Sequence, residues 1–382
     1  MENFFAPCPR GLESVLVQEL AALGATEVKA TDGGVHFNGP FDLCYRANLE
    51  SRIASRILWR VAVAPYRTED DIYRTALALD WPRWFAVGNT LRVNLAAHRC
   101  PLKSLDFATL RIKDAICDRF RSRGGERPSI DTHSPDVRVH AHLTADKLTL
   151  YLDSSGEALF KRGYRQAAGD APLRENLAAG ILRLAGWTPE EPLLDPMCGS
   201  GTFLIEAALI AFGIAPGGGR RFGFEKLKNF DDALWQRMKA ESQARELPRR
   251  ALSIYGSDLY GDELKTAHTN VATAGLESVV QLKQANVLEL PPPANDGVLV
   301  TNPPYGVRLG ETSELAAFYP KLGDALKQKF SDWRAYILSS DMALPKLIRL
   351  AASKRTPLYN GSLECRLFKF KLVAGSMRKK RD

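Results

Sequence analysis

The chain has 382 residues, of which 45% are hydrophobic and 25% charged, and its Lys and Arg exceed its Asp and Glu by a formal net charge of +8. A chain of this length and composition can bury a large core, which excludes a disulfide scaffold, a fibrous repeat and a mostly disordered protein. The moderate basic excess fits an anionic partner such as nucleic acid, although many basic proteins bind none.

The first part of the sequence predicts small α+β units. Apolar residues recur at helical spacing between Leu12 and Leu23, and Gly24 is expected to end that helix. The expected elements in chain order are a strand at 3–6, a helix at 12–23, strands at 27–30 and 34–37, a helix near 41–49, a strand at 56–64, two helical patches between 68 and 123 around a strand at 91–97, and a β-hairpin of 138–143 and 148–152.

The second half alternates strands with helices, which is typical of a parallel, doubly wound sheet. Its strands are expected at 193–195, 253–257, 279–283, 297–301 and 334–338. Two final runs, near 356–359 and 364–372, have no long helix between them and therefore predict a closing hairpin at one sheet edge. The boundary between the two parts is expected near 155–175.

Cysteine usage and apolar segments indicate the compartment. The six cysteines are irregularly spaced and form no C-x-x-C pair, so neither a zinc ribbon nor a disulfide framework is expected. The N-terminus lacks the pattern of a signal peptide, and the longest apolar stretch, 203–216, contains Glu206 and is too short to span a bilayer. We expect a cytoplasmic protein with no metal site and no membrane contact.

The segment LLDPMCGSGT, residues 193–202, is the first motif with chemical content. An apolar strand ends in Asp195, and a turn with Gly199 and Gly201 then opens a helix, so the backbone can approach a ligand closely. The third glycine of a dinucleotide motif is replaced by Leu204. An acid at the strand end also suits a cationic ligand, such as S-adenosylmethionine, better than a phosphate. A tight turn without a ligand is the alternative.

Two more strands end in polar residues. Asp258 ends the next strand, where a carboxylate can accept both ribose hydroxyls of an adenosine, although such an acid alone is often a helix cap or a solvated loop residue. Its register with the first motif favours the ribose interpretation. Asn286 follows the third strand, where an acid or amide often reads the adenine amino group, and an ordinary surface asparagine is the alternative.

The third motif is the strand and turn VLVTNPPYG, residues 298–306. An exocyclic amine of a nucleobase is a poor nucleophile because its lone pair is delocalised into the ring. The carbonyls of Asn302 and Pro303 can accept hydrogen bonds from that amine, which orients the lone pair and stabilises a cationic transition state. Pro304 keeps the turn rigid, and Tyr305 can stack on an extruded base. A proline-rich strand exit without this role is the alternative.

In this order, the motifs DPMCGSGT, GSD and NPPYG resemble class I S-adenosylmethionine-dependent N-methyltransferases that act on nucleobase amines. The flanking segments KRGYR, APLRENLAA and LYNGSLECR narrow the resemblance to THUMP-containing RNA guanine-N2 methyltransferases, above all to the stand-alone bacterial 23S rRNA enzymes. This resemblance spans essentially the whole chain. It implies a ferredoxin-like segment at 1–55, a THUMP RNA-binding domain at 56–160, and a Rossmann-like methyltransferase domain at 161–382 whose mostly parallel sheet has an antiparallel last strand.

The resemblance also implies a reaction and a set of site residues. The implied reaction transfers a methyl group from S-adenosylmethionine to the N2 amine of a specific guanine in 23S rRNA or a large-subunit precursor, leaving S-adenosylhomocysteine. The catalytic residues would be Asn302, Pro303, Pro304 and Tyr305, and the cofactor would lie against Asp195, Pro196, Cys198, Gly199, Gly201, Thr202, Asp258, Leu259, Asn286 and Asn302. Many relatives have Asp at the position of Asn286. A tRNA guanine-N2 methyltransferase, a DNA adenine-N6 methyltransferase and a non-catalytic RNA-binding assembly factor remain alternatives.

Residues 99–127 are the expected RNA contact. They carry eight positive and four negative charges, and the expected phosphate ligands are Arg111, Lys113, Arg119, Arg121, Arg123 and Arg127. A solvated helix whose cations favour its own C-terminus is the alternative.

Overall fold

The computed structural model describes residues 1–166, 173–303 and 311–373, without the side chains of 311–316, and its chain divides into two compact units. Unit 1 comprises Met1–Cys8, Val17–Leu159 and Gly217–Glu241, and unit 2 comprises Pro9–Leu16, Phe160–Pro216 and Ser242–Asp382. Each unit contains a seven-stranded sheet.

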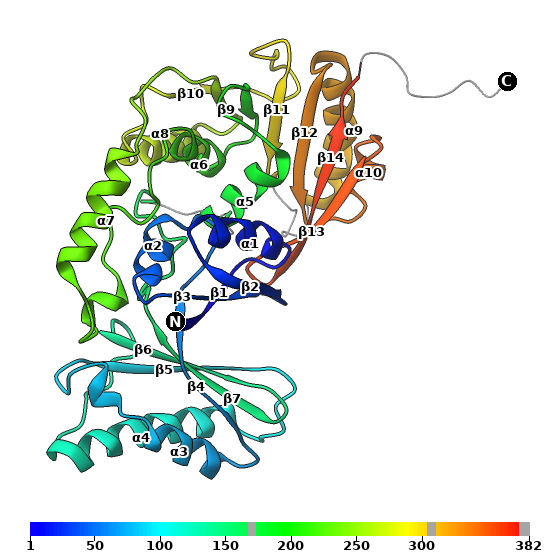
Figure 1. Cartoon of the computed structure of the whole chain (residues 1–382). Coiled ribbons are helices and arrows are strands. Elements are labelled where there is room, and N and C mark those ends of the chain that lie inside the picture. The colour runs from blue at the N-terminus through cyan, green and yellow to red at the C-terminus, as the bar shows by residue number, and fades with distance from the viewer. Residues whose placement is uncertain (167–172, 304–310, 374–382) are drawn as a thin grey trace. The chain divides into compact units, whose positions relative to one another are not determined.

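Unit 1 joins two α+β modules through one sheet (Figure 1). Its strands lie in the order β2-β3-β1-β4-β7-β6-β5, with β5 and β6 parallel and the other pairs antiparallel. The hairpin predicted from 138–143 and 148–152 is confirmed by the pairing of β6 with β7. The elements are β1 (Glu2–Pro7), α1 (Glu13–Ala22), β2 (Thr26–Thr31), β3 (Gly34–Gly39), α2 (Leu43–Glu50), β4 (Leu58–Pro65), α3 (Glu69–Ala78), η1 (Trp81–Arg83), β5 (Leu91–Ala97), α4 (Leu105–Gly124), β6 (Val137–Leu143), β7 (Lys147–Asp153), η2 (Gly223–Lys226) and α7 (Asp232–Ala244), which continues into unit 2.

The two faces of the unit 1 sheet differ. Side chains alternate between the faces along a strand, and strand pairing places Phe4, Trp59 and Leu152 on one face, where all three are buried. Phe4 stacks on Phe37 with a ring separation of 5.2 Å. Helix α4 packs on β5 and on α3, and both helices lie against this sheet (Figure 1). The opposite face carries most of the polar side chains of the strands.

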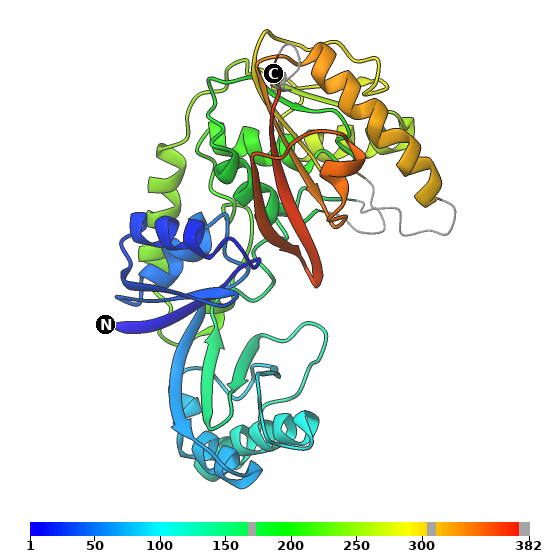
Figure 2. The same cartoon turned by 90° about the vertical axis from the view of Figure 1, so that its right-hand side faces the viewer.

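Unit 2 has the expected doubly wound arrangement. Strands β10-β9-β8-β11-β12 are parallel, β14 pairs antiparallel with β12, and β13 closes the edge as a hairpin with β14, drawn in orange-red in Figure 2. The elements are α5 (Glu175–Ala185), β8 (Leu193–Asp195), α6 (Thr202–Ala211), β9 (Ile254–Asp258), α8 (Gly261–Thr273), β10 (Val280–Gln284), β11 (Gly297–Thr301), α9 (Glu311–Lys329), β12 (Trp333–Ser339), α10 (Leu344–Leu347), β13 (Lys354–Asn360) and β14 (Leu363–Lys371).

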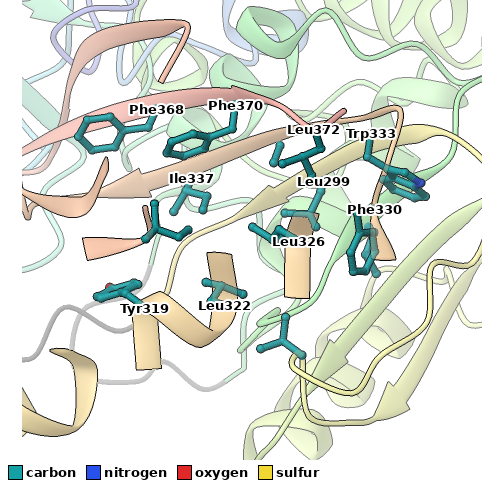
Figure 3. Packing of buried hydrophobic residues seen from close by; sticks show 14 of the residues in the cluster. Leu299, Tyr319, Leu322, Leu326, Phe330, Trp333, Ile337, Phe368, Phe370 and Leu372 are labelled. Carbon is teal, nitrogen blue, oxygen red and sulfur yellow. The ribbon is translucent and has the colours of Figure 1, made fainter. Parts of the chain in front are cut away.

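A large apolar cluster fixes the position of β11. Leu322 and Leu326 on α9 lie beneath Leu299 on β11 and Ile337 on β12, and Phe368 on β14 belongs to the same cluster (Figure 3). All five residues of β11 are buried. The end of β11, where the Asn-Pro-Pro-Tyr motif begins, is therefore held by a rigid strand. In the described part of the chain, no helix is long and apolar enough to cross a membrane.

Candidate cofactor and target-base site

The three motifs meet at one edge of the unit 2 sheet. Strand β8 pairs with β9 on one side and with β11 on the other, and all three run parallel. Their carboxyl ends therefore lie together, which places Asp195, Asp258 and Asn302 at neighbouring strand ends. This edge, next to the crossover between strands, is where ligands bind in open α/β sheets.

The glycine loop is tied to the end of β9. Gly199 and Gly201 have φ angles of +48° and +78°, a region that favours glycine. The Gly199 amide donates to Asp258 Oδ2 over 2.9 Å, and the Cys198 amide donates to the Ser257 carbonyl over 2.9 Å. Helix α6 then begins at Thr202. The loop conformation thus depends on the same carboxylate that is expected to hold the ribose.

Asp195 is a buried acid in an environment that lacks a matching cation among its described partners. Its exposed fraction is 2%, and its Oδ1 accepts from the Met197 amide over 3.2 Å. Burial, with a smaller contribution from the charge of Asp258, raises the pKa of Asp195 to about 7, although hydrogen bonds from the Thr301 hydroxyl and the Met197 amide oppose the rise. A cationic ligand group beside Asp195 would remove this cost of ionisation.

Asp258 combines a carboxylate with an apolar shelf. Its Oδ1 accepts from the Tyr260 amide over 3.1 Å and its Oδ2 from Gly199, which leaves each oxygen with capacity for a further hydrogen bond. The next two side chains are unusually exposed for apolar residues, Leu259 at 52% and Tyr260 at 68%. Carboxylate oxygens that can accept hydrogen bonds from hydroxyl groups, next to exposed apolar side chains, suit a nucleoside. Its ribose carries the hydroxyl groups, and its flat base can lie on the apolar surface.

Other predicted cofactor residues have local structural roles as well. Asn286 lies beside β9, because the Ala285 amide donates to the Asp258 carbonyl, and its Oδ1 accepts from the Leu288 amide over 3.0 Å. The Pro196 and Cys198 side chains are buried. Burial raises the pKa of the Cys198 thiol, which keeps it neutral and poorly nucleophilic. Only the backbone atoms of Pro196 and Cys198 therefore suit a contact with a ligand.

The target-base motif is described only in part. Asn302 is half-buried and Pro303 is buried at the end of β11. Pro304 and Tyr305 lie outside the described residues. Among the side chains that the structure describes, no group of three or more His, Cys, Asp or Glu is arranged to hold a metal ion.

A polar network beneath the glycine loop was not found from the sequence. Arg165 pairs through Nε with Glu175 over 2.9 Å, and its Nη2 donates to Thr202 Oγ1 over 3.0 Å. The Gln166 amide donates to Asn270 Oδ1 over 3.1 Å, and Asn270 Nδ2 donates to the Ser200 carbonyl over 3.0 Å. Two bridges thus connect residues 165–166 to the loop.

Asn270 could have been noticed in the sequence from its place on α8. It lies three residues after Ala267 and one before Val271, on the buried face of the helix, and its exposed fraction is 1%. A polar residue on such a face needs buried partners. The sequence could not indicate that these partners are the Gln166 amide and the Ser200 carbonyl, because both are distant along the chain.

We expect Asn270→Ala to destabilise the protein by about 1–3 kcal/mol, because it leaves the Ser200 carbonyl and the Gln166 amide without this partner. Loosening Ser200 should also weaken S-adenosylhomocysteine binding. Thermal melting and calorimetric titration measure the two effects. Thr269→Ala on the exposed side of α8 is the matched control, since that hydroxyl donates only to the Lys265 carbonyl of its own helix. Equal behaviour of the two variants would contradict the bridging role.

The expected RNA ligands on α4 are largely paired with acids. Arg111 lies 3.0 Å from Asp70, and Arg121 lies 2.9 Å from Asp118. The remaining ion pairs of this helix join Lys113 to Asp114 at 2.9 Å, and Arg119 and Arg123 to Asp80 at 3.8 and 3.4 Å. Arg127 is exposed beyond the Gly125 cap. These pairs agree with a solvated helix, and RNA binding by α4 stays a prediction.

Residues 162–369 match the family described as RMKL-like, methyltransferase domain, residues 66–153 match the THUMP domain, and residues 3–58 match the RlmL ferredoxin-like domain. The chain belongs to the RMKL-like methyltransferase family. The predicted resemblance and fold class are therefore confirmed: a ferredoxin-like region and a THUMP domain accompany a class I methyltransferase fold.

The relatives of this RMKL-like protein include both curated sequences and solved structures. Ribosomal RNA large subunit methyltransferase K/L of Shewanella sp. strain W3-18-1 is 43% identical over 99% of this chain and 54% of its own length. The chain thus spans about half the length of the curated relatives it matches. SMU.472, classed among methyltransferases and solved in complex with SAH, is 33% identical over 98% of this chain and 99% of its own, with a TM-score of 0.88. A protein of Listeria monocytogenes strain 4b F2365, named a predicted N6-adenine-specific DNA methylase, is 30% identical over 97% and 96% of the two chains, with a TM-score of 0.87.

Proposed function

We propose that the protein transfers a methyl group from S-adenosylmethionine to the exocyclic N2 amine of a specific guanine in 23S rRNA. The observation that carries the proposal is the meeting of Asp195, Asp258 and Asn302 at adjacent parallel strand ends, next to a glycine loop. The names of the ribosomal RNA methyltransferase K/L relatives support the choice of substrate. The matched ranges support a division into 1–55, 56–160 and 161–382, and the substrate implies a cytoplasmic location.

The residues at the strand ends fit S-adenosylmethionine. Asp195 is a carboxyl whose pKa is raised mainly by burial, and the ligand's ammonium would offset that cost of ionisation. Asp258 would accept from the ribose hydroxyls, with Leu259 against the base and Asn286 near its edge. Gly199, Gly201 and Thr202 would line the methionine part, with the backbone of Pro196 and Cys198. When bound, S-adenosylmethionine supplies a methyl group activated by a positively charged sulfur.

The chain's own groups would prepare the amine. The Asn302 side-chain carbonyl and the Pro303 main-chain carbonyl would each accept a hydrogen bond from the guanine NH₂, which turns the nitrogen lone pair toward the methyl group. Positive charge then develops on that nitrogen, and both dipoles stabilise it more than they stabilise the neutral amine. Pro304 and Tyr305 complete the motif in this proposal, with Tyr305 stacking on the base.

The proposal is tested by methylation with isotopically labelled S-adenosylmethionine. The purified protein is incubated separately with 23S rRNA, tRNA and DNA, and the digested products are analysed as nucleosides. We expect label in N2-methylguanosine from 23S rRNA. Label confined to tRNA would contradict the substrate, and label in N6-methyladenine would contradict the base. If no pool is labelled although the protein binds S-adenosylhomocysteine, a non-catalytic RNA-binding role replaces the proposal.

A further inference from the structure

The helix-free face of the unit 1 sheet gathers basic side chains from several strands. Strand pairing sets Lys29 of β2 opposite His36 of β3, and His36 opposite Phe5 of β1. On the next strands, Arg60 of β4 lies opposite Tyr151 of β7. Opposite residues of paired strands share a face, so these side chains lie together although they come from five strands.

The same face continues onto β6 and β5. His140 lies opposite Tyr151, and His142 follows two residues later on the same face. His98 comes directly after β5, and the pKa of His142 is lowered first by burial and then by the nearby charge of His98. His142 and His98 are both exposed. We call Lys29, His36, Arg60, His98 and His142 the basic sheet face.

The charges on the basic sheet face repel one another. Burial lowers the pKa of His36 most, and Arg60, His142 and Lys29 each lower it further. Every charge that acts on His36 in this way is therefore positive. Such a cluster is unfavourable until an anion approaches, and an anion would be attracted by several residues at once.

Three acids lie on or beside this sheet face, and each has a partner. Buried Asp153, at the end of β7, pairs with Arg56 at 2.5 Å and lies 3.3 Å from His140 Nε2. Glu157 pairs with Arg138 at 2.9 Å. At the β2 edge, Glu27 accepts from Asn38 over 2.5 Å. The cations of the basic sheet face thus differ from those of α4, whose ion pairs with acids a phosphate would have to displace.

Aromatic rings lie among these cations. The rings of Phe5 and His36 are 4.8 Å apart, and those of Phe5 and Tyr151 are 6.1 Å apart. Single-stranded nucleic acids bind where aromatic rings that can stack on bases lie beside cations that follow the backbone. An acidic peptide would use the cations but not the rings.

We infer that the basic sheet face binds the phosphate backbone of the substrate RNA, with Phe5 and His36 offering a surface to an unpaired base. The inference rests on the proposed function, because it names the surface that holds the same RNA. Phosphate contacts position a nucleic acid without selecting its sequence. The basic sheet face would therefore set affinity, while the strand-end site would select the guanine.

The test compares two double variants with equal loss of charge. Lys29→Gln with Arg60→Gln alters the basic sheet face, and Arg121→Gln with Arg123→Gln alters α4. Binding of labelled 23S rRNA transcripts to the full-length protein is measured as a function of salt. We expect the first variant to lose affinity at least about tenfold and to reduce the slope of log K against log salt by about two. The α4 variant should lose less affinity, because its cations already pair with acids.

Two controls keep the outcomes distinct. S-adenosylhomocysteine affinity and thermal melting should be unchanged in both variants, and if Arg60→Gln disturbs folding, the single change Lys29→Glu replaces the pair, since Lys29 is exposed and its reversal also removes two units of positive charge. Unchanged RNA affinity in the folded sheet-face variant would overturn the inference, and so would an equal loss in the α4 variant. Either result leaves the proposed function intact if the unaltered protein methylates 23S rRNA. Failure of the unaltered protein to methylate any RNA would instead overturn the proposed function.

Discussion

Asn302→Ala is expected to slow methyl transfer by about 10²–10³-fold, the usual effect of removing one dipole that stabilises a developing charge. The Asn302 carbonyl would interact most strongly with the amine as it becomes cationic, so its loss should appear in the chemical step more than in binding. Strand β11 is buried at every position and is held by the cluster around Leu299 and Leu326, so the truncation should not displace the strand end. Single-turnover methylation of 23S rRNA with saturating protein measures this step.

The control for this prediction is Asn286→Ala, at a residue that follows β10 at the same edge of the sheet. Asn286 caps its own turn through the Leu288 amide, and its proposed contact is with the cofactor, so that variant should change S-adenosylhomocysteine affinity more than the rate of methyl transfer. RNA affinity should stay within about twofold in both variants, since the bulk of RNA binding comes from phosphate contacts. An unchanged single-turnover rate for Asn302→Ala would rule out the proposed orientation of the amine.

The strand ends could be predicted from sequence because each signal is local. Asp195 and Asp258 directly follow short apolar runs, and parallel strands place such residues at one edge whatever the details of packing. The antiparallel hairpin of β13 and β14 could be predicted for a similar reason. Neighbouring parallel strands need a long crossover connection, usually a helix, so two strand-like runs joined by a short turn are expected to pair antiparallel.

Features that depend on tertiary contacts could not be predicted. Residues 9–16 belong to unit 2, and there Gly180 of α5 leaves room for the Leu12 side chain, which no periodicity reveals. The acids that pair with α4 are a second case. Asp118 could be paired with Arg121 from its helical spacing, but Asp70 and Asp80 approach the helix from other elements. A charge count over 99–127 therefore cannot show which of its cations are paired with acids from other elements.

Asp195→Asn is expected to stabilise the unliganded protein at pH 8 while weakening its affinity for S-adenosylhomocysteine. The pKa of Asp195 is raised to about 7 in the fold from an ordinary value of 3.8, so the folded state holds this proton more tightly than the unfolded state. The contribution of the Asp195 carboxyl to the free energy of unfolding is therefore largest below about pH 4, and it is lost as the pH rises to about 7. At pH 8 the loss approaches about 4 kcal/mol, from roughly three pKa units.

An amide at position 195 does not ionise, so the variant avoids that loss. Its thermal midpoint should exceed that of the unaltered protein at pH 8, and the difference should narrow by about half toward pH 5, where the unaltered carboxyl is mostly protonated in the fold. Asp262→Asn, at an exposed acid in the first turn of α8, is the matched control and should show no such gain. A lower midpoint for Asp195→Asn at pH 8 would contradict the proposed cost of burying this charge.

Folding without ligand favours a neutral side chain at position 195, whereas ligand binding should favour an ionised one. The ammonium of S-adenosylhomocysteine favours ionised Asp195, so the affinity of the unaltered protein should rise about tenfold between pH 6 and pH 8, with release of up to one proton near pH 6. Asp195→Asn should bind about 10–100-fold more weakly at pH 8, the effect of losing a charge-assisted hydrogen bond, and its affinity should vary little over this range. Calorimetric titration in buffers of different ionisation enthalpy measures both affinity and proton release. If the variant bound as tightly as the unaltered protein at pH 8, the buried carboxylate would not be the partner of the ammonium.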